Sequence, residues 1–225
     1  MKKYFEFFGI FILALFSFYY SNKTASVLKD TDEIMIRLKE ADKVLPQDAY
    51  IDGNYITPGI SGKVVDLSKS YDAMKRVGSF ISDLIVYKKV KPKISISNIY
   101  NKYIKSGNSI KNEISLIFKG TNNISTTLKK YNIDPLFYTT DLTKSKYCIL
   151  EDENFEMLNI CSMNKMHTII PIKVNQTIQI KKHLKPGSII MLDIDSISTD
   201  ELEYIIKYIK SKGLDIVSLN KLLEE

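Results

Sequence analysis

The sequence predicts an α/β fold built on a parallel sheet, and three observations predict it. Residues 185–223 alternate turn, strand, helix, strand and helix. Residues 112–138 repeat the strand–helix–strand order. The strands in these stretches include two continuous apolar runs, Ile114–Phe118 and Ile189–Ile194, which are typical of strands covered by helices on both faces. We therefore expect one α/β domain over residues 112–225.

The C-terminal stretch carries the clearest local signals. After the strand at 189–194, Ser198 and Glu201 have the spacing of a capping box, in which each side chain binds a free backbone amide at a helix start. Apolar residues follow at helical spacing, and Gly213 ends the helix where a left-handed conformation is needed. A second strand is expected over residues 215–219. Together these elements predict a β-α-β unit.

Two carboxylates follow the strand of this unit. Ligands in parallel sheets bind at the carboxyl ends of the strands, which here points to Asp193 and Asp195. Their spacing of two places both on one face of a strand, where a pair could bind a hard cation or perform acid–base chemistry. The alternative is a solvated strand end that leads into a helix start.

The N-terminal residues predict export. Two lysines, Lys2 and Lys3, precede an uncharged apolar run from Phe7 to Tyr20, as in a secretory signal or a signal anchor. We expect residues 1–22 to form a signal anchor or a signal peptide, with residues 4–20 in contact with the membrane. The C-terminal domain would then lie outside the cytoplasm on a single-pass cell-membrane protein, or be secreted if the signal is cleaved.

The region between the anchor and the domain carries no recognisable chemistry. Residues 23–52 predict a juxtamembrane helical stalk, and residues 53–111 an accessory α+β segment. Within that segment the glycine- and proline-rich stretch 55–66 predicts a surface loop. A helix is expected over residues 66–76, and a strand over residues 84–87.

Composition excludes one partner class. The net charge of +6 arises from 32 Lys+Arg against 26 Asp+Glu, and the excess lysines are scattered. Neither an arginine cluster nor a glycine–aromatic motif is present, so we do not expect nucleic acid binding. The acidic run formed by Glu151, Asp152, Glu153 and Glu156 is typical of a solvated face.

Histidines and cysteines are few. His167 adjoins an apolar strand and His183 lies among lysines, so a structural and an exposed role are expected for them. The two cysteines, Cys148 and Cys161, could form a disulfide outside the cytoplasm or remain as two buried thiols.

Three stretches together resemble the polysaccharide deacetylase (NodB-like) family: residues 114–120, the strand within Lys185-Pro-Gly-Ser-Ile-Ile-Met-Leu, and residues 204–223. The resemblance implies a shortened NodB-like distorted (β/α) barrel. The membrane-anchor helix expected from the N-terminal residues and a small accessory segment would precede it. It also implies the activity of the family, hydrolysis of an N-acetyl group with the help of a divalent metal such as zinc.

The catalytic positions of that family are degenerate in this chain. The paired aspartates fall on Lys119 and Gly120, and the late histidine falls on Asp193. The H-x-x-x-H motif is absent from the sequence, and the stretch between Tyr138 and Tyr147 that would contain it is short. We therefore expect no metal site and no cofactor.

The resulting expectation is a membrane-anchored extracytoplasmic pseudoenzyme that binds, or forms a scaffold on, cell-envelope glycan. Three aromatic residues, Tyr138, Tyr147 and Phe155, could contact sugars, although core packing is their alternative role. The alternative function is an active metal-dependent N-deacetylase of peptidoglycan or of an N-acetylglucosamine polymer, with a rearranged site at Asp193 and Asp195. A remnant without activity is a third reading.

Overall fold

The structure is a computed structural model that describes residues 2–143 and 145–225, with the side chains of residues 2–8, 27 and 29–32 left undescribed. The chain forms two compact units. The first comprises residues up to Leu45 together with Gly62–Val90, and the second comprises Pro46–Ser61 together with Lys91–Glu225. Each unit has its own hydrophobic core.

The first unit joins a long helix to a small α+β motif. Its elements are α1 (Lys2–Glu40), β3 (Gly62–Val65), α2 (Leu67–Lys75), a 3₁₀ turn (Ser82–Leu84) and β4 (Tyr87–Val90). The predicted helix at 66–76 is confirmed, because the Asp66 carboxylate accepts from the backbone amide of Lys69 and caps α2. Ile34 and Leu38 of α1 pack on Met74 of α2, and this contact forms the core of the unit.

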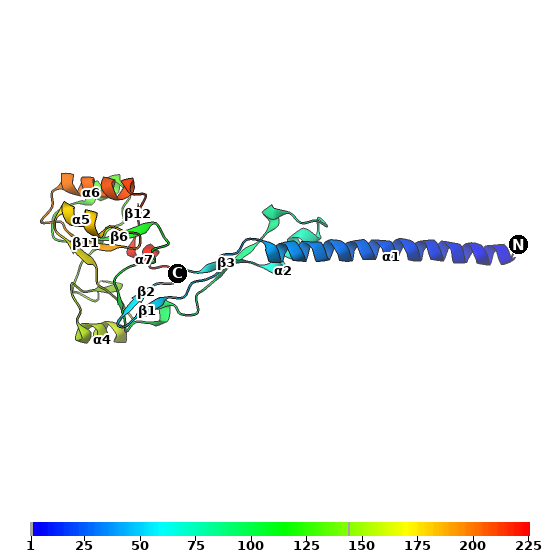
Figure 1. The fold of residues 1–225 in the computed structure, drawn as a ribbon, viewed down its shortest axis with the longest axis horizontal. Coiled ribbons are helices and arrows are strands. Elements are labelled where there is room, and N and C mark those ends of the chain that lie inside the picture. The colour runs from blue at the N-terminus through cyan, green and yellow to red at the C-terminus, as the bar shows by residue number, and fades with distance from the viewer. Residues whose placement is uncertain (1, 144) are drawn as a thin grey trace. The chain divides into compact units, whose positions relative to one another are not determined.

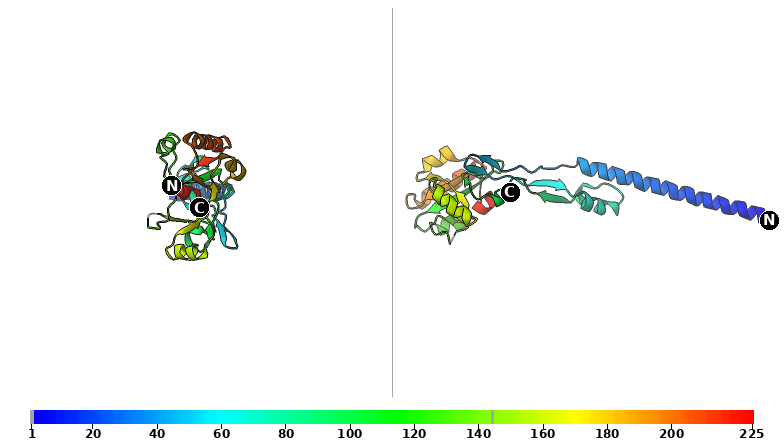
Figure 2. Two further views of the ribbon diagram at one scale, coloured as in Figure 1. Left: turned by 90° about the vertical axis from the view of Figure 1, so that its left-hand side faces the viewer. Right: turned by 90° about the horizontal axis from the view of Figure 1, so that it is seen from below.

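Helix α1 is one continuous helix (Figure 2). Residues 9–26 are exposed, including the apolar side chains on every side of the helix. Among the described residues, none of the helices combines the length and the apolar character that crossing a membrane requires. Met1 and the side chains of residues 2–8, which belong to the predicted anchor, lie outside the described residues.

The second unit contains two five-stranded sheets. The first has the order β1 (Tyr50–Asp52), β2 (Tyr55–Thr57), β5 (Tyr103–Ile104), β9 (His167–Ile169), β8 (Tyr147–Ile149). The second has the order β10 (Ile172–Val174), β11 (Ile189–Asp193), β6 (Glu113–Lys119), β12 (Asp215–Ile216), with β7 (Leu136–Phe137) also on β6. The helices are α3 (Ser125–Lys130), α4 (Phe155–Met163), α5 (Thr177–His183), α6 (Thr199–Ser211), α7 (Leu219–Leu222) and a 3₁₀ turn (Ile96–Asn98).

Strand β6 organises the second sheet. Its residues 115–119 pair in parallel with the whole of β11, with Lys119 opposite Asp193 at the carboxyl end. On its other side, β12 pairs with the start of β6 and β7 pairs with its end, both parallel. The predicted parallel sheet is therefore confirmed, and β6 lies between the two strands of the predicted C-terminal β-α-β unit.

Both faces of β6 and β11 are buried, as their continuous apolar runs predict. Phe118 and Leu192 lie on the face covered by α3, α5 and α6, in one cluster with Ile205 of α6. Ile117 and Met191 point to the opposite face, in a second cluster that the two sheets share. Figure 1 shows α5 and α6 on the same side of β6 and β11.

Two local predictions were wrong. Residues 55–66 are not a loop, because they contain β2 and β3, which pair with the distant strands β5 and β4. The strand predicted at 84–87 begins at Tyr87 and continues to Val90, since a 3₁₀ turn precedes it. In addition, β5 from the predicted accessory segment pairs with β9 of the predicted domain 112–225, so these two regions share a sheet.

A candidate site at the carboxyl ends of strands β6 and β11

A polar pocket of about 350 Å³ lies where β6 and β11 end. It is lined by Lys119, Glu151, Lys173, Val174, Asn175, Gln179, Met191 and Asp193. Its volume is at the small end of the range of about 300–1,000 Å³ that is usual for ligand pockets. The strand ends, the turn after β8 and the start of α5 supply these side chains, so the pocket lies at the edge where parallel sheets bind ligands.

An ion pair between Lys119 and Glu151 forms part of the wall of this pocket. The Lys119 Nζ donates to Glu151 Oε1 at 2.7 Å, and it also lies 5.6 Å from the centre of the Tyr138 ring. The hydrogen bond to Glu151 raises the pKa of Lys119 above its usual value. The amine is therefore fully protonated at neutral pH and is neither a base nor a nucleophile.

Gly120, the next residue, has a backbone that excludes a side chain. Its φ is +131°, and a Cβ would lie 2.7 Å from Ile194 Cγ1 and 2.8 Å from Asp195 Cγ. The chain can make this turn only because glycine lacks that atom. Position 120 therefore has no side-chain atom that could coordinate a metal ion.

The two candidate carboxylates have different surroundings. Asp193 lines the pocket, and its Oδ1 accepts from the Asp195 backbone amide at 3.1 Å. The Asp195 carboxylate instead accepts from the amides of Thr121 at 2.9 Å and Asn122 at 3.0 Å, which lower its pKa below the usual value. Asp195 thus fastens the turn after β6, and the two side chains do not form a carboxylate pair in the pocket.

The acidic run is not one solvated face, and the expectation was wrong for Glu151. Glu151 is half-buried against Lys119, while Asp152 pairs with Lys173 at 2.9 Å and Glu153 with Lys105 at 3.2 Å. The sequence reasoning therefore missed Glu151 as a site residue, together with Asn175 and Gln179. Its position directly after a buried strand, the same argument that singled out Asp193, could have found it.

The histidines lie away from this pocket. His167 begins β9, and its ring stacks on Tyr100 with 4.7 Å between centroids. Burial lowers the pKa of His167 below its ordinary value, which favours the neutral ring. His183 is exposed at the end of α5. Neither belongs to a metal-binding cluster, because the described residues contain no group of three metal-ligating side chains.

Of the two alternatives for the cysteines, the structure contains the disulfide. Cys148 of β8 and Cys161 of α4 are bonded, with their Cα atoms 6.0 Å apart. Both residues are buried, so the bond fastens α4 to the sheet from within. Phe155 is 58% exposed on the same helix, whereas Tyr147 is buried and donates its hydroxyl to Asn220.

The pocket does not fit a catalytic divalent metal. Such a metal needs at least three nitrogen or oxygen donors from the protein, usually histidines and carboxylates. Lys119 instead brings a cation to the end of β6, and Gly120 brings no side chain. Two carboxylates remain in the lining. Glu151 already binds the Lys119 ammonium, and Asp193 already accepts a hydrogen bond from the Asp195 backbone amide.

No protein-family model matches the chain, and no curated protein matches it either. Three solved structures are similar: wild-type BA3943, described as a CE4 family pseudoenzyme from Bacillus anthracis, and two of its mutants. Each has a TM-score of 0.57 and 19% identity, and the match covers 87% of this chain and 95–98% of the other. One mutant is described as having restored enzymatic activity.

The likeness shows the fold. The chain has the mixed α/β architecture of these CE4 family structures over most of its length. The mixed α/β architecture that the resemblance of residues 114–120, 185–192 and 204–223 implies is therefore confirmed. The described strands of the second unit form two separate five-stranded sheets rather than the single barrel sheet that was expected.

Proposed function

We propose that the protein is a catalytically inactive deacetylase-fold module that binds glycan at the cell envelope. One observation carries the proposal, namely the Lys119–Glu151 ion pair at the carboxyl end of β6. The resemblance places a base and a metal ligand at Lys119 and Gly120. Deacetylation needs a base and a polarising metal, and at these positions the chain offers a cation and a glycine.

The properties of the pocket support glycan as its ligand. Asn175 presents an amide donor and an amide acceptor, and Asp193 presents a carboxylate. Gln179 presents its amide nitrogen, since its Oε1 accepts from the Asn175 backbone amide at 3.1 Å. Hydroxyl and acetamido groups of a sugar therefore find both donors and acceptors. The positive charge of Lys119 is compensated by Glu151, and that of Lys173 by Asp152. The carboxylate of Asp193 then adds one negative charge that no lysine in the lining compensates, which disfavours an anion. A neutral sugar, whose hydroxyl groups can donate to Asp193, therefore fits the pocket better than an anionic ligand.

The neighbouring structures support loss of activity on this fold. BA3943 is described as a pseudoenzyme, and the chain shares its architecture at 87% coverage. BA3943 is therefore an example of a protein that has this fold and is described as lacking enzymatic activity. Binding is the function that such a fold can retain when its catalytic groups are gone.

Two assays on the full-length protein in detergent test this proposal. We expect no acetate release from N-acetylglucosamine oligomers or peptidoglycan in the presence of added zinc or cobalt. We expect the same protein to bind these oligomers, and Asn175→Ala to weaken the binding about fivefold through the loss of one hydrogen bond, worth about 1 kcal/mol. The matched control is Asn159→Ala on α4, which is exposed and does not line the pocket.

The outcomes separate three readings. Metal-dependent acetate release that Asp193→Ala abolishes would show an active deacetylase and would overturn the proposal. Absence of both activity and binding would identify a remnant without function. An equal loss of affinity in Asn175→Ala and Asn159→Ala would place the glycan outside this pocket.

We further propose that α1 anchors the protein in the cell membrane, with the C-terminal unit outside the cytoplasm. The apolar run from Phe7 to Tyr20 and the exposure of residues 9–26 on all sides support the anchor. The disulfide between Cys148 and Cys161 supports the compartment, because disulfides persist in oxidising environments outside the cytoplasm.

Membrane extraction tests the anchor. We expect the protein to remain in the membrane fraction at high pH and to be released by detergent, because each charged residue at the centre of a span costs about 3 kcal/mol and this run has none. The double substitution Leu13→Lys with Phe16→Lys should release it. Ile36→Lys, an exposed site in the same helix beyond the run, is the control and should stay in the membrane. Extraction of the unchanged chain at high pH would contradict the anchor.

A further inference from the structure

A stripe of tyrosines and lysines lies along helices α5 and α6, separate from the pocket. Tyr204 and Tyr208 of α6 are one turn apart and their rings stack at 6.3 Å. Lys181 of α5 places its Nζ 5.7 Å from the Tyr204 ring and 5.6 Å from the Tyr208 ring. Lys212 lies 5.3 Å from the Tyr208 ring. Ring and cation therefore alternate in the order Tyr204, Lys181, Tyr208, Lys212.

The cations of this stripe have no acidic partner among the residues that the structure describes. Within the described part of the chain, no ion pair involves Lys181 or Lys212. The nearest acid along α6, Glu203, binds Lys130 at 2.7 Å and Lys207 at 3.5 Å instead. Glu201 is engaged in the capping box at the start of α6. The aromatic faces hold the ammonium groups at the surface, and their charge remains available to an anion.

The spacing of the stripe indicates the chemistry of its ligand. Rows of residues four apart on a helix rise about 6 Å per step, so the stripe from Tyr204 to Lys212 spans about 12 Å. Lysine ammonium groups bind phosphate as point charges, and tyrosine rings contact the flat faces of sugars. Alternation of the two matches a chain in which sugar units alternate with phosphate groups.

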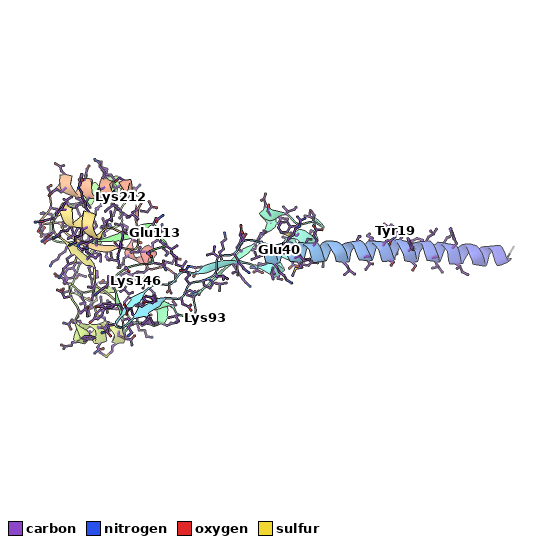
Figure 3. The ribbon with its side chains drawn as sticks, in the orientation of Figure 1. Tyr19, Glu40, Lys93, Glu113, Lys146 and Lys212 are labelled. Atoms are coloured by element: carbon purple, nitrogen blue, oxygen red, sulfur yellow. A yellow bond between two sulfur atoms is a disulfide. The ribbon has the colours of Figure 1, made fainter. Side chains whose placement is uncertain are left out.

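The composition of the stripe argues against a lipid surface. A membrane-binding helix presents a large apolar face, whereas the large apolar side chains exposed on α5 and α6 are Ile178, at the start of α5, and Tyr204. Lys212 stands at the end of α6, on the surface of the second unit (Figure 3). We propose that Lys181, Tyr204, Tyr208 and Lys212 form a binding surface for a sugar–phosphate polymer.

Binding of an abasic oligodeoxynucleotide, a sugar–phosphate chain without bases, to the full-length protein in detergent tests this surface. We expect Lys181→Gln with Lys212→Gln to weaken binding about tenfold at low salt, and to reduce the salt dependence by about two released counterions. Tyr204→Ala should weaken binding of this probe by about fivefold and leave binding of inorganic polyphosphate unchanged, because polyphosphate has no sugar to contact the ring.

The matched control removes two lysines elsewhere. Lys69→Gln with Lys75→Gln changes the net charge equally, at exposed positions of α2 in the first unit, and should leave affinity unchanged within twofold. Equal weakening in both double variants would show a general charge effect and overturn the proposal. Tighter binding to phosphatidylglycerol vesicles than to the oligomer would assign the stripe to a membrane surface instead. The proposal would also be overturned if neither the abasic oligodeoxynucleotide nor inorganic polyphosphate bound to the protein.

Discussion

Gly120→Ala is expected to lower the free energy of unfolding by about 3 kcal/mol. At φ +131°, a side chain adds backbone strain of about 1–3 kcal/mol, and crowding against a packed core adds about as much again. The added Cβ would meet Ile194 Cγ1 at 2.7 Å, and Ile194 is buried in the main core. Gly120→Asp should be destabilised at least as much, so the backbone itself opposes the aspartate that the resemblance to the NodB-like family implies at this position.

Urea denaturation of the two variants and the unchanged protein measures this loss. Gly213→Ala is the matched control, because its φ of +71° is also left-handed but nothing lies within 4 Å of an added Cβ. The control should lose only about 1 kcal/mol. Equal losses at both positions would show that strain alone acts, and that the turn after β6 has room for a side chain.

Removal of the disulfide by Cys148→Ala with Cys161→Ala is expected to reduce stability by about 3 kcal/mol. The bond closes a loop with a sequence separation of 13, for which the chain-entropy model gives a loss of this size. The buried position of both residues between β8 and α4 adds a small packing loss.

The single variant Cys148→Ala is the informative control, because it breaks the same bond. Cys148→Ala alone should lose nearly as much stability as the double variant. A reducing agent should destabilise the unchanged protein but should have no effect on either variant. Thiol titration of the unfolded, unreduced protein should find no free cysteine. Two free thiols, or an additive loss from the two substitutions, would contradict the bond.

The sequence predicted the parts of the fold that depend on neighbouring residues. The capping box of Ser198 and Glu201 is present, because both partners lie within one helical turn. The strands at 114–118 and 189–194 were found for a similar reason, since an apolar run is a local property. Gly213 has the positive φ that its place after α6 requires.

The parts that depend on distant partners were missed. Nothing near residues 55–57 shows that a strand at 103–104 will pair with them, and the glycines around them indicated a loop. In the site, Lys119 and Glu151 are 32 residues apart and meet only because β6 and β8 end in the same region. The sequence therefore located the strand ends but not the ion pair that occupies the pocket.

That ion pair has a thermodynamic consequence for any ligand of the pocket. The Lys119 ammonium already donates to Glu151 Oε1, and Asp193 Oδ1 already accepts from the Asp195 backbone amide. A ligand that approaches them exchanges one set of hydrogen bonds for another, so its net gain there is small. Discrimination among ligands then depends on shape, on the side-chain amide of Asn175 and on the Gln179 amide nitrogen, since Gln179 Oε1 already accepts from the Asn175 backbone amide. Affinity at a single pocket should therefore be modest. Tight attachment to an envelope polymer would have to come from many weak contacts made at once along the polymer.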